Sequence, residues 1–342
     1  MGCLRRGSLI RSLHATLVVA VATATTACSD DRIKVEVRTT FPDGLLAAVE
    51  ESFEVAHPDL DVRFSEASLD ASLGALRQSE VAPFDVWWGV PPIVLYEAAN
   101  EGLLQAYEPP WSQQADRPAY WHTVLTTPFV IAFNRTTVPL ADAPTDWIDV
   151  FHHAWYDDLR ALDPGRTREG AYFAGAMIVE ALRDDDDLDR GFEWLARLHE
   201  QVDAYVGEPN EAVRALQRDE ALIAILPRAG VERARAAEAP WIHYRVPESG
   251  TPELALGVAI VADTRQSDAA RAFVDHLGMS DIATLAKLYT HWEPQAGRVD
   301  EAALPADFEL AQSWRAYAPA IDTLATELDG WVERWSLEIG RR

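Results

Sequence analysis

The chain has very little cysteine. Cys3 and Cys28 are the only two among its 342 residues, and Cys3 lies in an N-terminal segment that we expect to be removed. The single cysteine that remains excludes an intrachain disulfide from the mature chain, even in a compartment that would permit one. The fold must be stabilised without such a crosslink.

Positive charge is also scarce. The sequence has 30 Lys and Arg against 55 Asp and Glu, so the formal net charge is −25 at pH 7. Removal of residues 1–27 would take away three of these arginines and no carboxylate, so the remaining chain would be still more negative. An acid excess of this kind repels phosphate-rich surfaces, so nucleic acid and anionic lipid surfaces are poor partners. It suits a soluble body outside the cytoplasm.

Long hydrophobic runs are missing after the first few residues. The apolar run 13–22 follows Arg5, Arg6 and Arg11 and is followed by small residues. This order is typical of a secretory signal peptide, and the run is too short to span a bilayer. We therefore predict a signal peptide over residues 1–27 and an extracytoplasmic location.

Motifs for catalysis and metal binding are absent as well. The sequence has no Gly-x-Ser-x-Gly, His-Glu-x-x-His or phosphate-loop pattern. The acidic run 184–189 fails as a calcium loop, because Arg190 stands where that loop requires glycine. His152 and His153 would point about 100° apart on a helix. We expect no catalytic residue, no metal and no cofactor.

The end of the predicted signal peptide, Thr25-Thr26-Ala27-Cys28, resembles the lipobox of bacterial lipoproteins. That resemblance implies cleavage before Cys28 and acylation of its sulfur, which would anchor the chain to a membrane through a tether over residues 28–32. Thr25 departs from the usual Leu, Val or Ile. The alternative is an ordinary signal peptide cut near Ala27, with Cys28 an incidental thiol.

From Ile33 onward the sequence alternates strand-like and helix-like patterns. The first block predicts strands at 33–37, 61–64 and 84–89 and helices at 45–56, 69–78 and 91–100. Helix-length crossovers between strands indicate a parallel sheet covered on both faces.

A long apolar segment at 124–133, broken by Thr126-Thr127-Pro128, leads into a second alternating block. We predict helices at 147–155, 170–182, 188–201 and 208–218, and strands at 159–162, 204–206, 221–226 and 242–246. The strand at 254–262 returns to the first block and is followed by helices at 269–277 and 282–288. The tail over 308–335 is expected to be mostly helical.

The predicted fold class is α/β, with two doubly wound α/β lobes joined by a two-segment hinge near 126–128 and 253–257. The expected boundaries are 33–127 plus 257–305 for lobe 1, 128–256 for lobe 2, and 306–342 for the C-terminal helices. Ligands of such sheets bind beyond the carboxyl ends of the strands, near the starts of helices. We therefore expect a ligand cleft between the lobes.

Several segments, taken in order, resemble the extracytoplasmic solute-binding proteins of ABC importers, in the type II group related to iron, thiamine, polyamine and phosphonate binders. The resemblance extends over about residues 33–300. The matching segments are 84–89, 100–104, 130–134, 162–167, 191–195, 206–213 and 270–277. It implies a type II periplasmic-binding fold, a monomer, a small-molecule solute, and permease and ATPase partners.

Two departures from the family pattern bear on the solute. Ferric-iron members carry adjacent tyrosines after the strand that corresponds to 221–226, whereas residues 227–232 here contain none. Iron therefore lacks its ligands. The family's Ser-Gly-Thr turn, which normally holds an anion, is altered to Thr167-Arg168-Glu169-Gly170. Arginines at that helix start can still hold an anion through paired hydrogen bonds.

The candidate ligand residues of the first lobe lie where its strands end. Thr39, Thr40 and Phe41 follow the first strand, and helix capping is the alternative role for each. Trp87 and Trp88 are adjacent in a strand and so point to opposite faces. We expect one of them to be core and the other, beside Gly89, to be a stacking platform for a ring or a cation.

The candidates of the second lobe are mostly cationic. Arg166, Thr167 and Arg168 precede a helix and favour an anion, although they are equally consistent with a solvated loop. Tyr172 is expected to line the same pocket, and Arg228 replaces the missing tyrosines. We also expect a loop to return Trp292 and Glu293 to the cleft, a surface turn being the alternative.

These residues favour a lipid-tethered receptor for a small polar solute with an anionic group, such as a phosphorylated sugar or a phosphonate. A carbohydrate or a polyamine is the second choice, favoured by the tryptophan content and the overall acidity. A sensory receptor feeding a membrane kinase would use the same fold. An exported enzyme that uses carboxylates in the cleft is disfavoured, because no sequence motif indicates a pair of catalytic acids.

Overall fold

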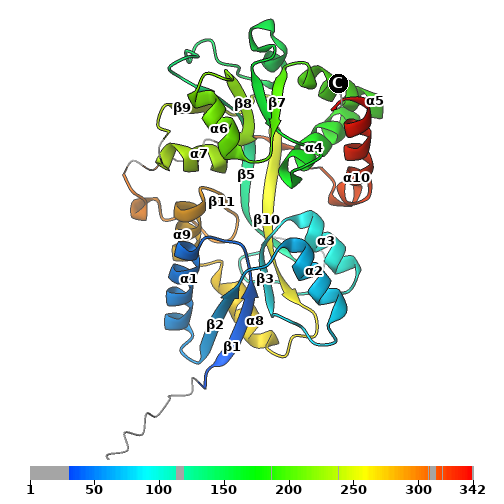
Figure 1. Ribbon diagram of the computed structural model, residues 1–342. Helices are drawn as coiled ribbons and strands as arrows, with labels where there is room; N and C mark the ends of the chain where they lie inside the picture. The colour runs from blue at the N-terminus through cyan, green and yellow to red at the C-terminus, as the bar shows by residue number, and fades with distance from the viewer. Residues whose placement is uncertain are drawn as a thin grey trace, which may run out of the picture. The chain divides into compact units, whose positions relative to one another are not determined.

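The computed structural model describes residues 31–112, 119–185, 187–237, 239–306, 308, 313–317 and 319–340. The predicted signal peptide, Cys28 and the tether up to Asp30 lie outside these residues. Among the described residues, no helix is both long enough and apolar enough to cross a membrane. The body from Arg32 onward forms one compact unit, which Figure 1 shows as two α/β lobes joined by two long strands.

The first lobe is built on three parallel strands, because each short apolar strand is followed by an amphipathic helix that returns the chain to the same edge. The sheet order is β2-β1-β3-β10, and β1 pairs in parallel with both β2 and β3. The strands are β1 (Ile33–Arg38), β2 (Leu60–Ser65) and β3 (Val86–Val90), and the helices are α1 (Asp43–Ala56), α2 (Leu69–Gln78) and α3 (Pro92–Asn100). One apolar cluster fills each face of this sheet.

Two long antiparallel strands, β5 (His122–Asn134) and β10 (Thr251–Val261), pair with each other and belong to the sheets of both lobes. The apolar segment 124–133 is part of one strand, since β5 runs through Thr126-Thr127-Pro128 without interruption. On one side of β5, pairing with β11 (Glu293–Pro294) ends at Thr126, and pairing with β8 (Ile223–Pro227) begins at Phe129. Pro128 lies between these two partners, where its missing N–H breaks no ladder.

The second lobe has its own sheet, in the order β5-β8-β6-β7, in which β8, β6 and β7 are parallel and β5 is antiparallel to β8. Phe129 to Phe133 of β5 contribute to its core, which is separate from the clusters of the first lobe. The further strands are β6 (Leu159–Leu162), β7 (Val202–Val206) and β9 (Ile242–Arg245), and the helices are α4 (Arg168–Asp185), α5 (Leu188–His199), α6 (Pro209–Gln217) and α7 (Arg228–Ala237). The predicted helix at 147–155 is two 3-10 turns, η1 (Trp147–Phe151) and η2 (His153–Trp155), the first held by a capping box between Asp146 and Asp149.

After β10 the chain returns to the first lobe and then ends against the second. The remaining elements are β4 (Leu104–Gln105), α8 (Ser267–His276), α9 (Ser280–Thr290), η3 (Glu301–Ala303), β12 (Ala316–Tyr317) and α10 (Ile321–Glu338). Helix α10 packs on α4 and α5 through Leu324, Trp331 and Trp335. The expected long helical tail is therefore one helix preceded by a short strand.

The predicted fold class of two α/β lobes with a C-terminal helix is confirmed. The prediction of α2 at 69–78 and of the strand at 159–162 matches the structure at both ends. The residue boundaries assigned to the two lobes stay a prediction.

Candidate functional site

The carboxyl ends of the parallel strands of both lobes lead into helix starts that contact one another. In the first lobe, β2 leads to the start of α2, where Asp70 lies; in the second, β6 leads to the start of α4 at Arg168. An ion pair joins these starts, with 2.7 Å between Arg168 Nη2 and Asp70 Oδ1. The edges at which α/β sheets bind ligands therefore face each other (Figure 1).

Thr39 and Phe41 form a local turn at the end of β1. The Thr39 N–H donates to the Ser65 carbonyl at 3.0 Å, and its Oγ1 accepts from the Phe41 N–H at 3.3 Å. Thr39 is buried, whereas Thr40 is exposed. Gly89, with φ of +82°, leaves space for the Phe41 ring, because a Cβ there would lie 2.8 Å from it. Thr39 thus has a structural partner, but it does not cap α1, whose N-cap is Pro42.

Trp87 and Trp88 point to opposite faces of β3, as expected. Each is only 2% exposed. Trp87 packs beside Phe84 in one apolar cluster, and Trp88 packs between Phe41 and Phe273 in the other. The expected stacking platform is wrong, because β3 is an interior strand whose two faces are both covered by helices.

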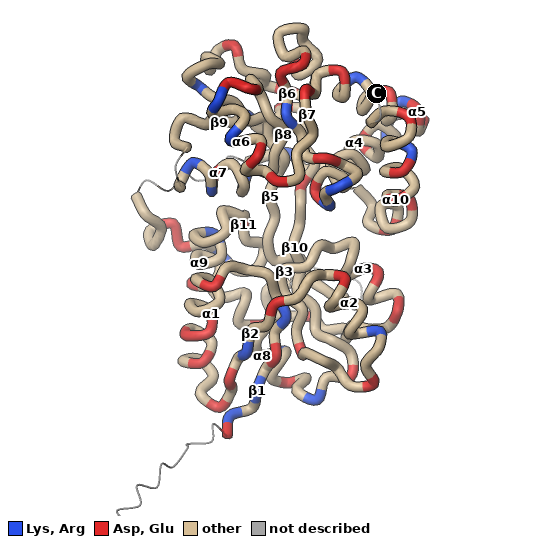
Figure 2. Tube along the Cα trace, viewed as in Figure 1, with Lys and Arg blue, Asp and Glu red and all other residues tan. Residues whose placement is uncertain are grey.

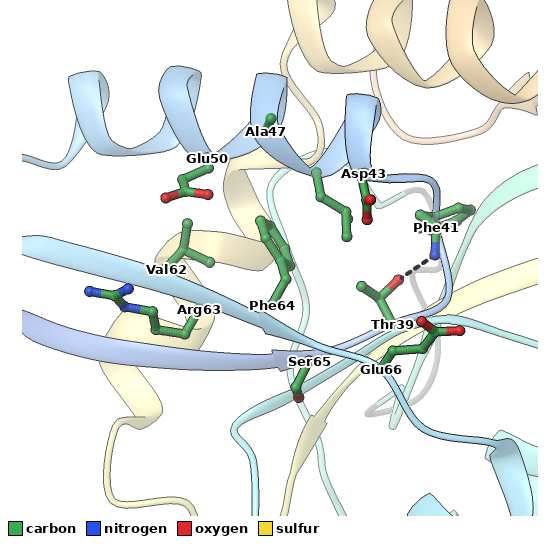
Figure 3. A pocket seen from close by; sticks show the side chains of 11 residues that line it. Thr39, Phe41, Asp43, Ala47, Glu50, Val62, Arg63, Phe64, Ser65 and Glu66 are labelled. Carbon is green, nitrogen blue, oxygen red and sulfur yellow. Dashed lines mark hydrogen bonds between the residues drawn. The ribbon is translucent and has the colours of Figure 1, made fainter.

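A cavity of about 380 Å³ opens between α1 and β2 and reaches Thr39 and Phe41. Figure 3 shows its apolar side chains, among them Phe64, together with the carboxylates of Asp43, Glu50 and Glu66. Arg63 also lines the cavity, and its guanidinium is paired with the Asp61 carboxylate at 2.7 Å. Rings and carboxylates suit a cation or a polyhydroxyl group better than an anion.

The predicted anion site at the start of α4 is partly occupied by its own hydrogen bonds. Thr167 Oγ1 donates to the Asp163 carbonyl at 2.8 Å and accepts from the Gly170 N–H at 3.0 Å, so it caps the helix. Arg166 is exposed and lies 3.8 Å from Asp163. Arg168 is bound to Asp70. All three residues lie at the edge of the second lobe that faces the first. The ion pair of Arg166, at 3.8 Å, is longer than that of Arg168, at 2.7 Å.

Tyr172 lies farther along α4 and contacts a strand that joins the lobes. Its hydroxyl donates to the Glu253 carbonyl on β10 at 2.8 Å. Burial, and secondarily the charge of Glu253, raises the pKa of Tyr172, so the phenol stays protonated at neutral pH. It acts as a hydrogen-bond donor between α4 and β10.

Arg228 and Glu293, predicted separately, form an ion pair across the lobes. Arg228 is the first residue of α7 and follows β8 directly, whereas Glu293 lies in β11 of the first lobe. Arg228 Nη2 donates both to Glu293 Oε1 and, at 2.9 Å, to the His291 carbonyl. Lys287 on α9 contacts both oxygens of the same carboxylate at 2.5 Å. Trp292 packs beside this site against the first-lobe core.

Three charged residues at the contacts between the lobes were not among the predicted ligand residues: Lys287, Glu253 and Asp70. Lys287 is a lysine on the apolar face of a predicted helix, a pattern that could have signalled a buried charge. Glu253 is an acid at the predicted hinge; burial raises its pKa, while hydrogen bonds from Trp314 and Thr126 oppose the rise. Asp70 gave no signal, because its role depends on how the lobes meet.

Metal-binding groups are not assembled in the described part of the chain, where no three His, Cys, Asp or Glu side chains come together. Arg228 follows β8 directly. At this position the ferric-iron binders of the family that the sequence resembles carry tyrosine. The departures noted in the sequence therefore fall on the facing edges of the lobes.

Comparison with known proteins identifies the class. A model of the bacterial extracellular solute-binding proteins matches residues 42–285. A Sinorhizobium fredii protein described as "Probable ABC transporter periplasmic-binding protein y4fP" is 27% identical over 268 residues, which are 75% of this chain and 72% of that protein.

Solved structures share the fold. The periplasmic binding protein AfuA of Actinobacillus pleuropneumoniae, solved with fructose-6-phosphate, has a TM-score of 0.67 at 19% identity, covering 91% of this chain and 99% of its own. The ferric binding protein of Campylobacter jejuni has a TM-score of 0.71 at 14% identity, covering 89% and 98%.

The chain belongs to the bacterial extracellular solute-binding proteins. It is an extracytoplasmic binding protein of an ABC transporter, with a small-molecule ligand and with permease and ATPase subunits as partners. The family predicted from the sequence is confirmed.

Proposed function

We propose that the protein captures a small organic solute with an anionic group between its two lobes and delivers it to the permease. The observation that carries this proposal is the placement of Arg168 and Arg228. Each is the first residue of a helix that follows a parallel strand of the second lobe, and each side chain reaches the first lobe. Helix starts and guanidinium groups both favour anions.

Two further points support an anionic organic solute over iron. Arg228 stands directly after β8 and is cationic, so it repels a trivalent cation. A relative of the same fold was solved with fructose-6-phosphate, a solute that carries an anionic phosphoryl group. The low identity limits that comparison to the fold, so the residues of this chain decide the solute class.

The proposed action is binding followed by a shift between open and closed arrangements of the lobes, with no bond made or broken. The predicted acylation of Cys28 would hold a monomeric receptor near its transporter and raise its effective concentration there. A receptor feeding a membrane kinase would bind the same solute, and neighbouring genes encoding a sensor kinase would favour that role.

A thermal-shift screen of the mature protein, followed by calorimetry, tests the proposal. The probes are sugar phosphates, phosphonates, neutral sugars and polyamines. We expect the largest rise in melting temperature from an organic anion, because a ligand that binds only the folded state stabilises it. Tight binding restricted to neutral or cationic solutes would refute the anionic class. Chemical turnover of the bound solute would refute a pure binding role.

A polyamine or a carbohydrate is the second candidate, and the cavity between α1 and β2 favours it. Its carboxylates and aromatic rings suit these solutes, and acidic residues occur throughout both lobes, several of them along α1 (Figure 2). Substituting Glu66 by Gln should weaken binding of such a solute. It should leave binding of an anion unchanged or slightly stronger.

A further inference from the structure

The carboxylate of Glu293 bridges two buried cations that come from different lobes. It contacts Lys287 on α9 and Arg228 on α7. Only 2% of the Arg228 side chain and 3% of the Lys287 side chain are exposed, against 19% for Glu293. Two buried cations need a neighbouring anion to offset the loss of solvent. The anion that does so, the Glu293 carboxylate, is itself partly exposed to solvent.

The other acid of this cluster is already occupied. Glu232 on α7 accepts a hydrogen bond from the Tyr244 hydroxyl at 2.7 Å and lies 3.5 Å from Arg235, but 4.0 Å from Arg228. Glu293 is thus the principal counter-ion of Arg228 and Lys287 among the described residues.

Arg228 keeps one hydrogen-bond donor unused. Its Nε is buried and has no acceptor among the described residues. A carboxylate that takes only Nη2 leaves this donor unpaired, whereas an anion with more oxygens could accept from both nitrogens. The guanidinium is therefore incompletely satisfied by Glu293.

The surroundings are also electropositive. Burial, and after it the positive charges of Arg233, Arg228 and Lys287, lowers the pKa of the neighbouring His291 to about 4. Burial disfavours charge of either sign, but the contributions of the three cations show a local excess of positive charge, which attracts an anion.

We propose that Glu293 is an internal counter-ion that occupies the place of the solute's anionic group. In the proposal, the solute's oxygens take over Arg228 and Lys287, and the Glu293 carboxylate moves out to solvent. The inference rests on the proposed function and deepens it, because it assigns Arg228 and Lys287 to the anion and makes Glu293 a competitor that sets affinity.

The test uses inorganic phosphate as the probe and calorimetry on the full chain without its signal peptide. We expect Glu293→Gln to lower the Kd for phosphate about tenfold relative to the unsubstituted protein, because the competitor is lost. Adding Arg228→Gln to that variant should remove the gain. Asp268→Asn changes net charge equally at a fully exposed position on α8 and should leave the Kd unchanged.

Should Glu293→Gln fold poorly, Glu293→Asp keeps the charge on a shorter side chain and should give a smaller gain. Unchanged or weaker phosphate binding in a folded Glu293 variant would overturn the inference. An equal gain in Asp268→Asn would overturn it too, since net charge alone would then explain the effect. If the solute screen finds only neutral or cationic ligands while Glu293→Gln still gains phosphate, the proposed function fails and the counter-ion assignment stands.

Discussion

Two arginines at the facing edges of the lobes are paired with carboxylates from the opposite lobe. Arg168 pairs with Asp70, and Arg228 pairs with Glu293. Arg228, with 2% of its side chain exposed, can recognise a solute only by exchanging its partner. Arg168 is exposed and contacts Asp70 through Nη2 alone, so it can keep this pair while it holds a solute. Substitutions of the acidic partners are therefore as informative as substitutions of the arginines.

Gly89 is a single position at which backbone and packing both require glycine. Its φ of +82° is disfavoured for other residues, and an added Cβ would lie 2.8 Å from the Phe41 ring. We expect Gly89→Ala to lower the free energy of unfolding by about 1–3 kcal/mol, measured by urea denaturation.

Gly74 provides the matched control. It lies inside α2, and a Cβ there would meet nothing within 4 Å. Gly74→Ala should raise the free energy of unfolding by about 0.5–1 kcal/mol. Equal effects at the two positions would show that the strain at Gly89 is not real.

His291 should make stability depend on pH. Its folded pKa, lowered to about 4 mainly by burial, lies below the ordinary value of 6.5. Between these values the unfolded chain binds a proton that the folded chain does not, so stability falls as pH falls from 6.5 towards 4. The largest slope that one such group adds is about 1.4 kcal/mol per pH unit.

His291→Asn removes this titration and keeps a residue that tolerates the left-handed backbone at φ 59°. We expect the free energy of unfolding of the variant to fall less steeply with acid than that of the unsubstituted protein. Parallel curves from pH 7.5 to pH 4.5 would contradict the assignment.

At the scale of elements, α10 stabilises the second lobe through its buried tryptophans. Trp335 packs edge-on to Tyr205, with ring centroids 5.2 Å apart, inside the cluster formed with α4 and α5. Trp335→Ala should cost about 3–5 kcal/mol of unfolding free energy. The exposed Leu337, two residues away on the same helix, should cost less than about 0.5 kcal/mol when changed to alanine. Similar losses for both would mean that α10 is not a packed element.

The elements that the sequence predicted well are those whose pattern is local. Helix α2 begins after the cap residue Ser68 and has clear amphipathic spacing, so both of its ends were predicted. No strand was predicted over the apolar segment 124–133, because Pro128 is a strong local breaker. Only the sheet register shows that its missing N–H falls between two partner strands.

The site was predictable in its positions but not in its pairings. Arg168 was chosen because it precedes a predicted helix, and Arg228 because it replaces the family's tyrosines; in the structure each begins a helix at the facing edges. The burial of both Trp87 and Trp88 follows from helices that cover each face of β3, which the strand alone does not reveal. The partners Asp70 and Glu293 depend on contacts across the lobes, over distances in sequence that no local pattern encodes.

At the scale of the whole molecule, the two lobes are joined by the strands β5 and β10, by packing of α10 on α3 and by contacts between their edges. The Arg168–Asp70 pair is the outermost of those described here, with 56% and 85% of the two side chains exposed. An exposed pair adds little to folding stability. Because it joins two bodies that must approach each other to hold a solute, it can still shift their equilibrium.

We therefore expect Asp70→Asn to leave the melting temperature unchanged and to raise the Kd for the bound solute. The solute is the one that gives the largest thermal shift in the screen. A pair worth about 0.2–1 kcal/mol corresponds to an increase in Kd of up to about fivefold. The effect should vanish at about 1 M salt, where the Debye length is near 3 Å and exposed charges are screened.

Asp268 is the matched control for net charge. Its side chain is fully exposed and pairs with Arg271 at 3.6 Å within α8, so the pair does not join the lobes. Asp268→Asn should leave the Kd unchanged at every salt concentration. If Asp70→Asn behaves in the same way, the Arg168–Asp70 pair has no part in closure. A loss that persists at high salt would instead indicate that Asp70 contacts the solute directly, because a short contact within a closed site is screened far less than an exposed pair.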